Sequence, residues 1–479
     1  MKLSINEELT QFLSQIRRLA APNKIWLVGG AVRDLLLGKA VKDLDFVMAD
    51  GSARLAKKVR KHFEGVSYSL DDERQTARVI LHMGEPDELI MDFASFIGEN
   101  LEEDLRQRDF TINSMAIDLD DLNQVFDPLF GLDDLEAKKL RLSGPKSLDT
   151  DPLRVIRLVR MMRTYGLEID AETEELLRIA IEGLDRVSGE RIRDEILKCV
   201  KLPGLAKTYR LFEENGIFKK LFELAGFQGE NDPDDASFER FSYSSKFLTK
   251  LENLLDDIND ENKGSDSITI LAENHQVHNL LTETIQGGRS RRQLLLLFAF
   301  FFSRIVDVYR LRSEAETYCD GNLINCEEFA KKISHFLMMG VKEEKYFASL
   351  CQGYFGISKL EREKEIKNLD FYRYFKAIGS YGVESALLQI ANQNASEQPS
   401  QTIIDLAEKI IFTWFFEQEG LVNPPRLVDG LSLQQKLKLK AGPKMGEYLE
   451  EVREAQVIGL VKTEEEALEF VRALMSEDR

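Results

Sequence analysis

Two acidic side chains separated by one apolar residue are the first chemical feature of this sequence. Asp43 and Asp45 lie in the apolar segment DLDFV, residues 43–47. Alternate residues of a β-strand face the same side, so the two carboxylates point together while Leu44 and Phe46 point into the core. Paired carboxylates repel and call for a cation, and Mg²⁺ typically takes one or two protein carboxylates together with substrate phosphates. The spacing predicts a magnesium site at Asp43 and Asp45, which would also be the catalytic residues.

A glycine pair precedes these aspartates. Gly29 and Gly30 end a short apolar run, and an amphipathic helix carrying Arg33 and Asp34 follows them. Glycines let backbone N–H groups approach a phosphate closely, and Arg33 would lie near the same phosphates. The order strand, glycine turn, helix, aspartate strand indicates a nucleoside-triphosphate site for metal-assisted phosphoryl or nucleotidyl transfer. A buried glycine turn beside a solvated aspartate pair is the simpler alternative, but the two motifs in this order favour the functional interpretation.

The string GGAVRDLLLG at residues 29–38, followed by DLDF, resembles the opening of the class II tRNA nucleotidyltransferase and bacterial poly(A) polymerase family, in the DNA-polymerase-β-like superfamily. The resemblance implies an α+β fold, with a polymerase-β-like nucleotidyltransferase head domain followed by an all-α neck, body and tail. The 479 residues suffice for about three domains of ordinary size. We expect a head, a helical neck and body, a helical domain resembling a degenerate phosphohydrolase-like domain, and a helical tRNA-binding tail, with the bounds 1–143, 144–225, 226–420 and 421–479.

Hydrophobic periodicity and turn residues outline the elements that hold these motifs. The patterns predict helices over residues 7–19, 53–62 and 151–165, strands over 66–70, 77–82 and 88–93, and a turn-rich hairpin over 125–142. The strand at 88–93 places Asp92 toward one face. Whether Asp92 is a third catalytic carboxylate stays open, since aspartates at strand ends are also common in turns.

A second motif follows at residues 107–113, where most family members carry arginine–arginine–aspartate–phenylalanine–threonine–x–asparagine. Here the string is QRDFTIN, so Gln107 replaces the first arginine. The resemblance implies that Arg108 contacts the triphosphate, a role suited to its planar, permanently charged guanidinium. It also implies that Asp109 accepts hydrogen bonds from ribose hydroxyls and that Asn113 belongs to the nucleotide site.

Nucleotide choice can be argued from the segment DPLRVIRLVRMMRTY, residues 151–165. On their pairing edges cytosine and adenine each offer an amino donor beside a ring-nitrogen acceptor, whereas uracil and guanine offer a carbonyl beside an N–H. One carboxylate beside one guanidinium therefore matches C and A. Asp151 and Arg154, three residues apart, supply that pair. Arg157 and Arg160 would support it or contact phosphate. A solvated arginine face capped by an aspartate is the alternative, and Thr150 replaces a glutamate common in the family.

The composition limits the partners and the cellular setting. The net charge is −19, which disfavours bulk nucleic-acid binding, because such binding depends on phosphate neutralisation. An enzyme of this charge must concentrate its arginines locally and hold only part of a nucleic acid. Four cysteines without paired spacing suggest reduced thiols. The start lacks a signal-peptide core, and the most apolar segment, 294–302, is too short to span a bilayer. We therefore expect a cytoplasmic protein with no membrane contact.

The middle and the tail carry weaker signals. The adjacent His-Asp pair that marks a metal-dependent phosphohydrolase domain in many relatives is missing from the apolar helix at 294–307. The tail at 427–474 resembles that of the longer family members. Four lysines there, beside a Gly-Pro helix start, form the best local basic patch or, equally, a solvated lysine face: Lys436, Lys438, Lys440 and Lys444.

Together these features favour a tRNA nucleotidyltransferase that adds C and/or A from CTP and ATP to the tRNA 3′ end, with Mg²⁺ and without a nucleic-acid template. A poly(A) polymerase acting on RNA 3′ ends is one alternative, disfavoured by the acidic charge and the tail. A catalytically inactive RNA-binding protein is another, disfavoured by the intact Asp43, Asp45 and Arg108. Full CCA addition, CC-only addition, A-only addition and the oligomeric state are left open.

Overall fold

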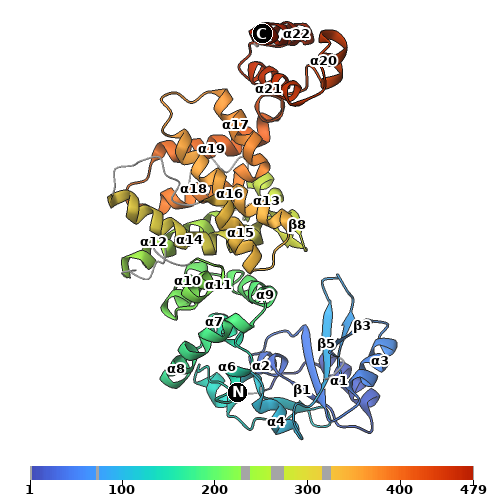
Figure 1. Ribbon diagram of the computed structural model, residues 1–479. Helices are drawn as coiled ribbons and strands as arrows, with labels where there is room; N and C mark the ends of the chain where they lie inside the picture. The colour runs from blue at the N-terminus through green and yellow to red at the C-terminus, as the bar shows by residue number, and fades with distance from the viewer. Residues whose placement is uncertain (1–2, 72–74, 228–237, 260–273, 316–324, 478–479) are drawn as a thin grey trace. The chain divides into compact units, whose positions relative to one another are not determined.

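The structure is a computed structural model that describes residues 3–71, 75–227, 238–259, 274–315 and 325–477 (Figure 1). The chain forms two compact units. The N-terminal unit comprises residues 1–195 and 214–220, and the C-terminal unit comprises residues 196–213 and 221–479. A mixed sheet lies in the first unit, and the described part of the second is helical apart from one short hairpin. The expected α+β class is confirmed, while the finer four-domain division stays a prediction.

The N-terminal unit is built on a seven-stranded sheet with the order β3-β4-β5-β2-β1-β6-β7. The pair β2–β5 is parallel and the other neighbouring strands are antiparallel. The strands expected at 66–70, 77–82 and 88–93 are present, with ends within two residues of those predicted. The strands are β1 (Trp26–Val28), β2 (Asp43–Met48), β3 (Val66–Asp71), β4 (Thr76–Leu81), β5 (Leu89–Ser95), β6 (Ala116–Asp118) and β7 (Val125–Phe126).

The two faces of this sheet have different surroundings. Helices α1 (Glu7–Ala20) and α3 (Ser52–His62), both close to prediction, lie together on one side (Figure 1). Leu44 and Phe46 of β2 are buried, whereas Asp45 is half-buried and Asp43 is exposed, which confirms the expected alternation. On the face of Asp45, helix α4 (Leu101–Arg106) packs near β1 and β6. The carboxylate-bearing face is therefore covered at one end of the sheet.

The hairpin predicted over residues 125–142 is wrong. Strand β7 pairs with β6, and the segment then forms helix α5 (Gly131–Glu136). The Asp127 carboxylate explains the difference, because it accepts hydrogen bonds from the backbone N–H groups of Gly131 and Leu132, both at 2.8 Å. A side chain that satisfies the free N–H groups of a first turn favours a helix at that place.

Helices follow the sheet in the N-terminal unit. The helix predicted from Asp151 begins at Arg154 instead and runs to Tyr165 as α7. In the preceding turn the Arg154 N–H donates to the Asp151 carbonyl at 3.0 Å, and this three-residue spacing is tighter than that of an α-helix. Glycine 166, at φ 64°, ends it, as expected of a left-handed C-terminal residue. The same unit contains α2 (Gly30–Leu36), α6 (Ser147–Thr150) and α8 (Ala171–Ala180). The helices α9 (Gly189–Val200) and α11 (Ile217–Leu224) cross the boundary between the two units, and α10 (Leu205–Glu214) belongs almost entirely to the C-terminal unit.

In the C-terminal unit, residues 294–302 of α14 are buried throughout, as their continuous apolar run predicts. A hairpin of β8 (Thr284–Gln286) and β9 (Arg289–Ser290) precedes α14. The helices are α12 (Phe238–Asn259), α13 (Asn274–Thr282), α14 (Arg291–Ala315), α15 (Cys326–Phe336), α16 (Val341–Leu360), α17 (Asn368–Ile378), α18 (Gly382–Ala395), α19 (Gln401–Phe416), α20 (Gly430–Leu437), α21 (Pro443–Val457) and α22 (Glu464–Glu477).

The tail helices α20, α21 and α22 enclose a small core of their own, which includes Leu433, Val452 and Val471. Across the described residues, the chain has no helix whose length and hydrophobicity would let it span a bilayer.

A buried ion pair joins two helices of the C-terminal unit. Arg291 Nε and Nη2 lie 2.6 and 2.7 Å from the carboxylate oxygens of the fully buried Glu384, which also accepts from Tyr346 Oη at 3.2 Å. We predict that Glu384→Ala lowers the free energy of unfolding by about 3 kcal/mol or more, because the buried guanidinium loses its main counter-charge. Denaturant unfolding measures the loss.

The exposed pair of Arg373 and Glu454 is the matched control for this stability prediction. Its guanidinium and carboxylate lie 2.6 Å apart but the arginine is largely exposed, so Arg373→Ala should cost less than about 1 kcal/mol. Equal losses in the two variants would contradict a special role for the buried pair.

Candidate active site

The glycine corner, one aspartate and one arginine meet at the end of β1. Gly29 has φ 77°, a conformation that favours glycine. A Cβ added there would lie 3.1 Å from Asp45 Oδ2 and 3.1 Å from Arg108 Nη1. The missing side chain thus leaves room for a carboxylate and a guanidinium to approach the same backbone corner. Gly30 follows as the first residue of α2.

Asp43 and Asp45 share one face of β2, as predicted. Burial raises the pKa of the Asp45 carboxyl; Arg108 opposes this shift, while the nearby Asp92 and Asp43 add to it. A carboxylate in this position is short of positive charge, which suits an added cation. Among the described residues, no group of three or more His, Cys, Asp or Glu side chains is placed to hold a metal. The two aspartates offer oxygen ligands only, which fits a cation such as Mg²⁺ that takes its remaining ligands from phosphates and water.

Asp92, the possible third carboxylate, lies directly beside Asp45 on the parallel strand β5. Its two oxygens are each 2.7 Å from Arg78, from Nε and Nη2, on the neighbouring strand β4. This bidentate contact neutralises Asp92 in the structure. A role of Asp92 as a metal ligand stays untested.

Hydrogen bonds to Asp104 fix the orientation of the Arg108 guanidinium. Its Nε and Nη2 donate to Asp104 Oδ2 at 3.2 and 3.1 Å, and the buried Asp104 is itself held by the Ile97 N–H at 3.0 Å. These bonds leave Nη1 directed at the Gly29 corner, where the added Cβ would meet it. The arrangement orients one edge of the guanidinium toward the position expected for a triphosphate.

Asp109 and Asn113 are buried in a polar network. Asp109 Oδ1 accepts from Phe110 N–H and Asn113 Nδ2, both at 2.9 Å, and Oδ2 lies 3.0 Å from Arg157 Nη2. Burial alone would raise the pKa of Asp109, but Arg157 and the hydrogen bonds outweigh it and lower that pKa. Asp109 is therefore ionised and bound by protein groups, and its expected contact with ribose hydroxyls stays a prediction.

Arg33 is buried rather than open to a ligand. Its guanidinium donates to Asn113 Oδ1, contacts both Asp34 oxygens at 3.0 Å, and lies 4.2 Å from the centre of the Tyr165 ring. Tyr165 in turn donates to Asp34 at 2.9 Å. Arg33 thus connects α2 to the end of α7, and its expected triphosphate contact stays untested. No signal in the sequence pointed to Tyr165 as part of this site.

Arg154 binds backbone beside Arg108. Its Nη1 donates to Ser147 Oγ at 2.8 Å and to the carbonyls of Ser147 and Arg108 at 3.0 and 3.2 Å, and Nη2 donates to the Gln107 carbonyl at 2.9 Å. Its buried Nε has no acceptor. Asp151 Oδ2 accepts from Arg191 on α9 at 2.8 Å. Of the two expected base readers, Arg154 is the first residue of α7 and Asp151 lies in the turn before it, and a paired action on a base stays a prediction.

Arg160, another arginine of this helix, has a structural contact. Arg160 Nε donates to the buried Glu195 of α9. This ion pair connects α7 to α9, and that of Asp151 with Arg191 connects the turn before α7 to the same helix. The sequence predicted Arg160 as support for the base readers, and its contact with phosphate stays untested.

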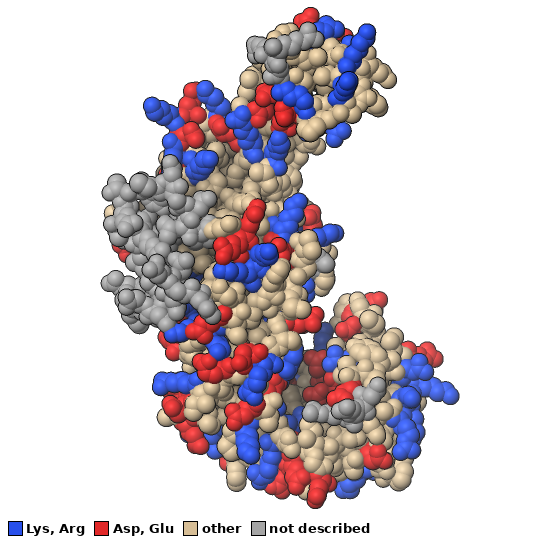
Figure 2. Space-filling view, in the orientation of Figure 1, with Lys and Arg blue, Asp and Glu red and all other residues tan. Residues whose placement is uncertain are grey.

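Charge on the surface is mixed. On the face shown in Figure 2, basic and acidic side chains are interspersed, in keeping with the net charge of −19. Two of the tail lysines pair with acids: Lys436 lies 2.6 Å from Glu464 and Lys444 lies 3.2 Å from Glu447. The predicted basic patch of the tail is therefore partly neutralised, which leaves its role as a phosphate-binding surface a prediction.

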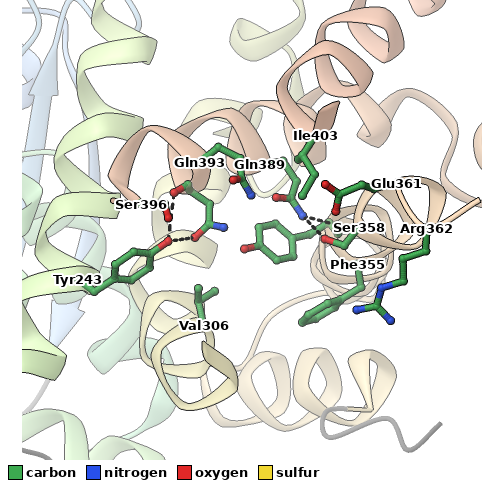
Figure 3. Close-up of a pocket in the computed structure, with 12 residues that line it drawn as sticks. Tyr243, Val306, Phe355, Ser358, Glu361, Arg362, Gln389, Gln393, Ser396 and Ile403 are labelled. Carbon is green, nitrogen blue, oxygen red and sulfur yellow. Dashed lines mark hydrogen bonds between the residues drawn. The ribbon is translucent and has the colours of Figure 1, made fainter. Parts of the chain in front are cut away.

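A cavity of about 260 Å³ lies in the C-terminal unit, between α12, α16, α18 and α19 (Figure 3). Polar and apolar groups contribute about equally to its wall. Amides and hydroxyls come from residues such as Gln389, Asn392 and Tyr243, and the charged lining residues are Glu361 and Arg362. Gln389 donates to Ser358 Oγ at 2.8 Å across one side of the cavity. One arginine balanced by one glutamate does not suit a triphosphate, so the aspartate-bearing face of the sheet is the better nucleotide site.

Comparison with known families assigns two parts of the chain. Residues 25–141 match the family described as "Poly A polymerase head domain". Residues 166–225 match the family described as "Probable RNA and SrmB- binding site of polymerase A". The first match spans both aspartates, the glycine corner and Arg108.

Relatives match along nearly the whole chain. The CC-adding tRNA nucleotidyltransferase of Synechocystis is 27% identical over 455 residues, 95% of this chain and 94% of that protein. The A-adding tRNA nucleotidyltransferase of Deinococcus radiodurans is 27% identical over 464 residues, 93% of this chain and 94% of that protein. A solved Thermotoga maritima CCA-adding enzyme complexed with tRNA has the same fold, with a TM-score of 0.60 at 20% identity over 98% of this chain and 96% of that one.

Proposed function

Because the chain belongs to the family of tRNA nucleotidyltransferases and poly(A) polymerases, we propose that it adds C and/or A from CTP and ATP to the 3′ end of tRNA. The observation that carries this proposal is the meeting of Asp45 and Arg108 at the Gly29 corner, with Asp43 on the same strand face. Carboxylates for a metal and a guanidinium for phosphate, on one small surface, are what nucleotidyl transfer requires.

Enzymes of this family generally need a divalent metal ion. We infer that the ion is Mg²⁺ and that Asp43 and Asp45 would hold it, since both offer only oxygen ligands. Bound there, Mg²⁺ would activate the acceptor 3′-hydroxyl and neutralise charge that develops on the departing pyrophosphate.

The protein's own groups bind and orient the nucleotide. Arg108, fixed by Asp104, would donate from Nη1 to the triphosphate, and Gly29 leaves space for it. Arg154 supports this position by binding the carbonyls of Gln107 and Arg108. Arg33, Asn113, Asp109 and Arg157 form the buried network behind the site and would reach the nucleotide only through small rearrangements.

Base selection is the part of the proposal assigned to Asp151 and Arg154. We predict that Arg154→Ala raises the rate with UTP relative to CTP about tenfold or more, because the donor that matches C and A is removed. Single-turnover rates with each nucleotide measure this ratio. Arg178→Ala, an exposed arginine of α8 paired with Glu174, is the control and should leave the ratio unchanged.

The other outcome has a clear structural meaning. Arg154 also holds the backbone of residues 107 and 108. If Arg154→Ala slows addition of every nucleotide equally while UTP and GTP stay excluded, the residue only positions Arg108, and the base-reading assignment is wrong.

The experiment that tests the function uses three acceptors: tRNA ending before CCA, tRNA ending after CC, and an unrelated RNA. Each nucleotide is supplied alone, and the products are read at single-nucleotide resolution. Extension of the tRNAs by C, A or both supports the proposal and separates CC-only, A-only and full CCA addition. No extension of any acceptor by the purified protein would contradict it.

A poly(A) polymerase is the second candidate, since both matching family descriptions refer to poly(A) polymerase. Long A-tracts on the unrelated RNA would favour it over the tRNA-specific activity. Both candidates use the same aspartates and Arg108, so the two differ in the acceptor and in product length.

A further inference from the structure

Two rows of side chains cross the carboxylate-bearing face of the sheet. Residues paired directly between neighbouring strands point to the same side. The pairs Asp45–Asp92, Asp92–Arg78 and Arg78–Tyr68 therefore place four side chains in one row across β2, β5, β4 and β3. The bidentate contact of Arg78 with Asp92 confirms that these two share a face.

The second row begins at the other aspartate. Asp43 pairs with Ile90, Ile90 with Ile80, and Ile80 with Val66. Val66 and Tyr68, two residues apart on β3, thus lie side by side on the face that carries both aspartates. The edge strand β3 adds an apolar and an aromatic side chain to the active-site face.

Both of these β3 side chains are open to solvent. Val66 is 50% exposed and Tyr68 is 45% exposed, whereas helix α4 covers the same face near β1. A sheet face with large apolar side chains is normally packed against another layer. This end of the face is therefore accessible to a ligand.

The geometry of nucleotidyl transfer indicates which substrate lies over this end of the sheet. In nucleotidyl transfer the attacking and leaving oxygens lie roughly in line, on opposite sides of the reacting phosphorus. Gly29 and Arg108, on the β1 side of Asp45, mark the side of the triphosphate and hence of the leaving pyrophosphate. The acceptor 3′-hydroxyl must then approach Asp45 from the opposite side, over β5, β4 and β3.

We propose that Tyr68, with Val66 beside it, is a stacking platform for an unpaired base of the acceptor RNA. This inference rests on the proposed function and names the surface that would hold its second substrate. Aromatic rings bind single-stranded RNA by stacking with little sequence preference. Tyr68 lies three strand spacings from Asp45, roughly 14 Å, so the stacked base belongs to a nucleotide upstream of the terminal one.

The test uses Tyr68→Ala and Tyr68→Phe, with Ile179→Ala as the control. Ile179 is an exposed side chain of α8 away from this face. Arg78 is avoided, because it neutralises Asp92 beside the aspartate pair. KM for the acceptor tRNA, KM for the nucleotide and kcat are measured separately. In parallel, 2-aminopurine placed at each unpaired 3′ position in turn reports stacking by quenching.

We expect Tyr68→Ala to raise KM for the acceptor about tenfold or more, with KM for the nucleotide and kcat unchanged. Tyr68→Phe keeps the ring and loses only the hydroxyl contact with Arg78, so it should keep the acceptor KM of wild type, as should Ile179→Ala. One upstream 2-aminopurine should be quenched by wild type and Tyr68→Phe, and not by Tyr68→Ala.

The proposal is overturned if Tyr68→Ala leaves the acceptor KM unchanged, or if it changes acceptor KM, nucleotide KM and kcat in parallel. It is also overturned if Tyr68→Phe raises the acceptor KM as much as Tyr68→Ala does, or if the protein is a dimer that only Tyr68→Ala dissociates. The last would assign the edge strand to self-association. If wild type adds no nucleotide, the proposed function fails, and quenching alone decides on the platform: its loss in Tyr68→Ala supports the platform, and its absence in wild type overturns it.

Discussion

Asp45→Asn should reduce nucleotide addition by more than about a thousandfold and leave the fold intact. The substitution keeps the shape of the side chain but removes half of the charge that would hold the metal, and metal stabilisation of a transition state is worth several kcal/mol. Burial and two neighbouring carboxylates raise the pKa of Asp45. Because the substitution removes the repulsion between Asp45 and these carboxylates, Asp45→Asn should unfold at the same temperature as wild type or higher. Asp43→Ala should lose addition as well.

The control for this substitution is Asp50→Asn, which removes an exposed carboxylate shortly after the same strand, where Asp50 pairs loosely with Arg54 at 3.7 Å. Its addition rate should equal that of wild type. Primer-extension rates and thermal melts of the three proteins are measured together. Substantial addition by Asp45→Asn would remove the aspartate pair from the mechanism.

Arg108→Ala should lower kcat/KM for the nucleotide by roughly a hundredfold to a thousandfold, because the group that would neutralise the triphosphate is lost. Arg108→Lys should recover only part of the loss, since an ammonium cannot keep both the contact with Asp104 and the position of Nη1 at the Gly29 corner. The rates are measured at limiting CTP or ATP with saturating tRNA.

Arg106→Ala is the matched control for Arg108. Arg106 lies two residues away on α4 and forms an exposed pair with Glu102. Its removal should leave kcat/KM unchanged. A similar loss in both variants would mean that Arg108 acts through general charge near the site and not through a directed contact.

Sequence patterns were sufficient for the parts of this fold that rest on local periodicity. The alternation of Asp43 and Asp45 with buried Leu44 and Phe46 predicted which face of β2 is open. The glycine pair at the start of α2 predicted a turn where backbone N–H groups approach a phosphate, and the structure shows Asp45 and Arg108 at that turn, while the phosphate contact stays a prediction. Both results follow from residues near one another in the chain or from the two-residue repeat of a strand.

Long-range partners were beyond what the patterns could give. Nothing local to Arg33 indicates that Asn113 and Tyr165 enclose it, and nothing local to Asp92 indicates that Arg78 occupies both its oxygens. Arg154 presents the same problem, since its acceptors are carbonyls of residues 107 and 108. Such contacts depend on strand order and helix packing, which periodicity does not encode.

The first residue of α7 was also predicted incorrectly from the sequence. Asp151 before Pro152 is typical of a helix cap, yet the turn at 151–153 is tighter than an α-helix. Asp151 Oδ1 accepts from the Leu153 N–H at 3.3 Å, while Oδ2 accepts from Arg191 at 2.8 Å. One carboxylate oxygen of Asp151 thus caps this turn, and the other is bound by α9. Whether the pair of Asp151 and Arg154 reads a base therefore depends on how these contacts change when a nucleotide binds.

Binding of Mn²⁺, followed by electron paramagnetic resonance with a non-reacting CTP analogue, tests the central claim most directly. The account predicts that wild type binds the metal–nucleotide complex and that the double variant Asp43→Asn, Asp45→Asn does not, while both proteins keep the same thermal stability or the variant gains some. Equal binding of the complex by the two proteins would contradict it, because the metal would then be held by groups other than the two aspartates.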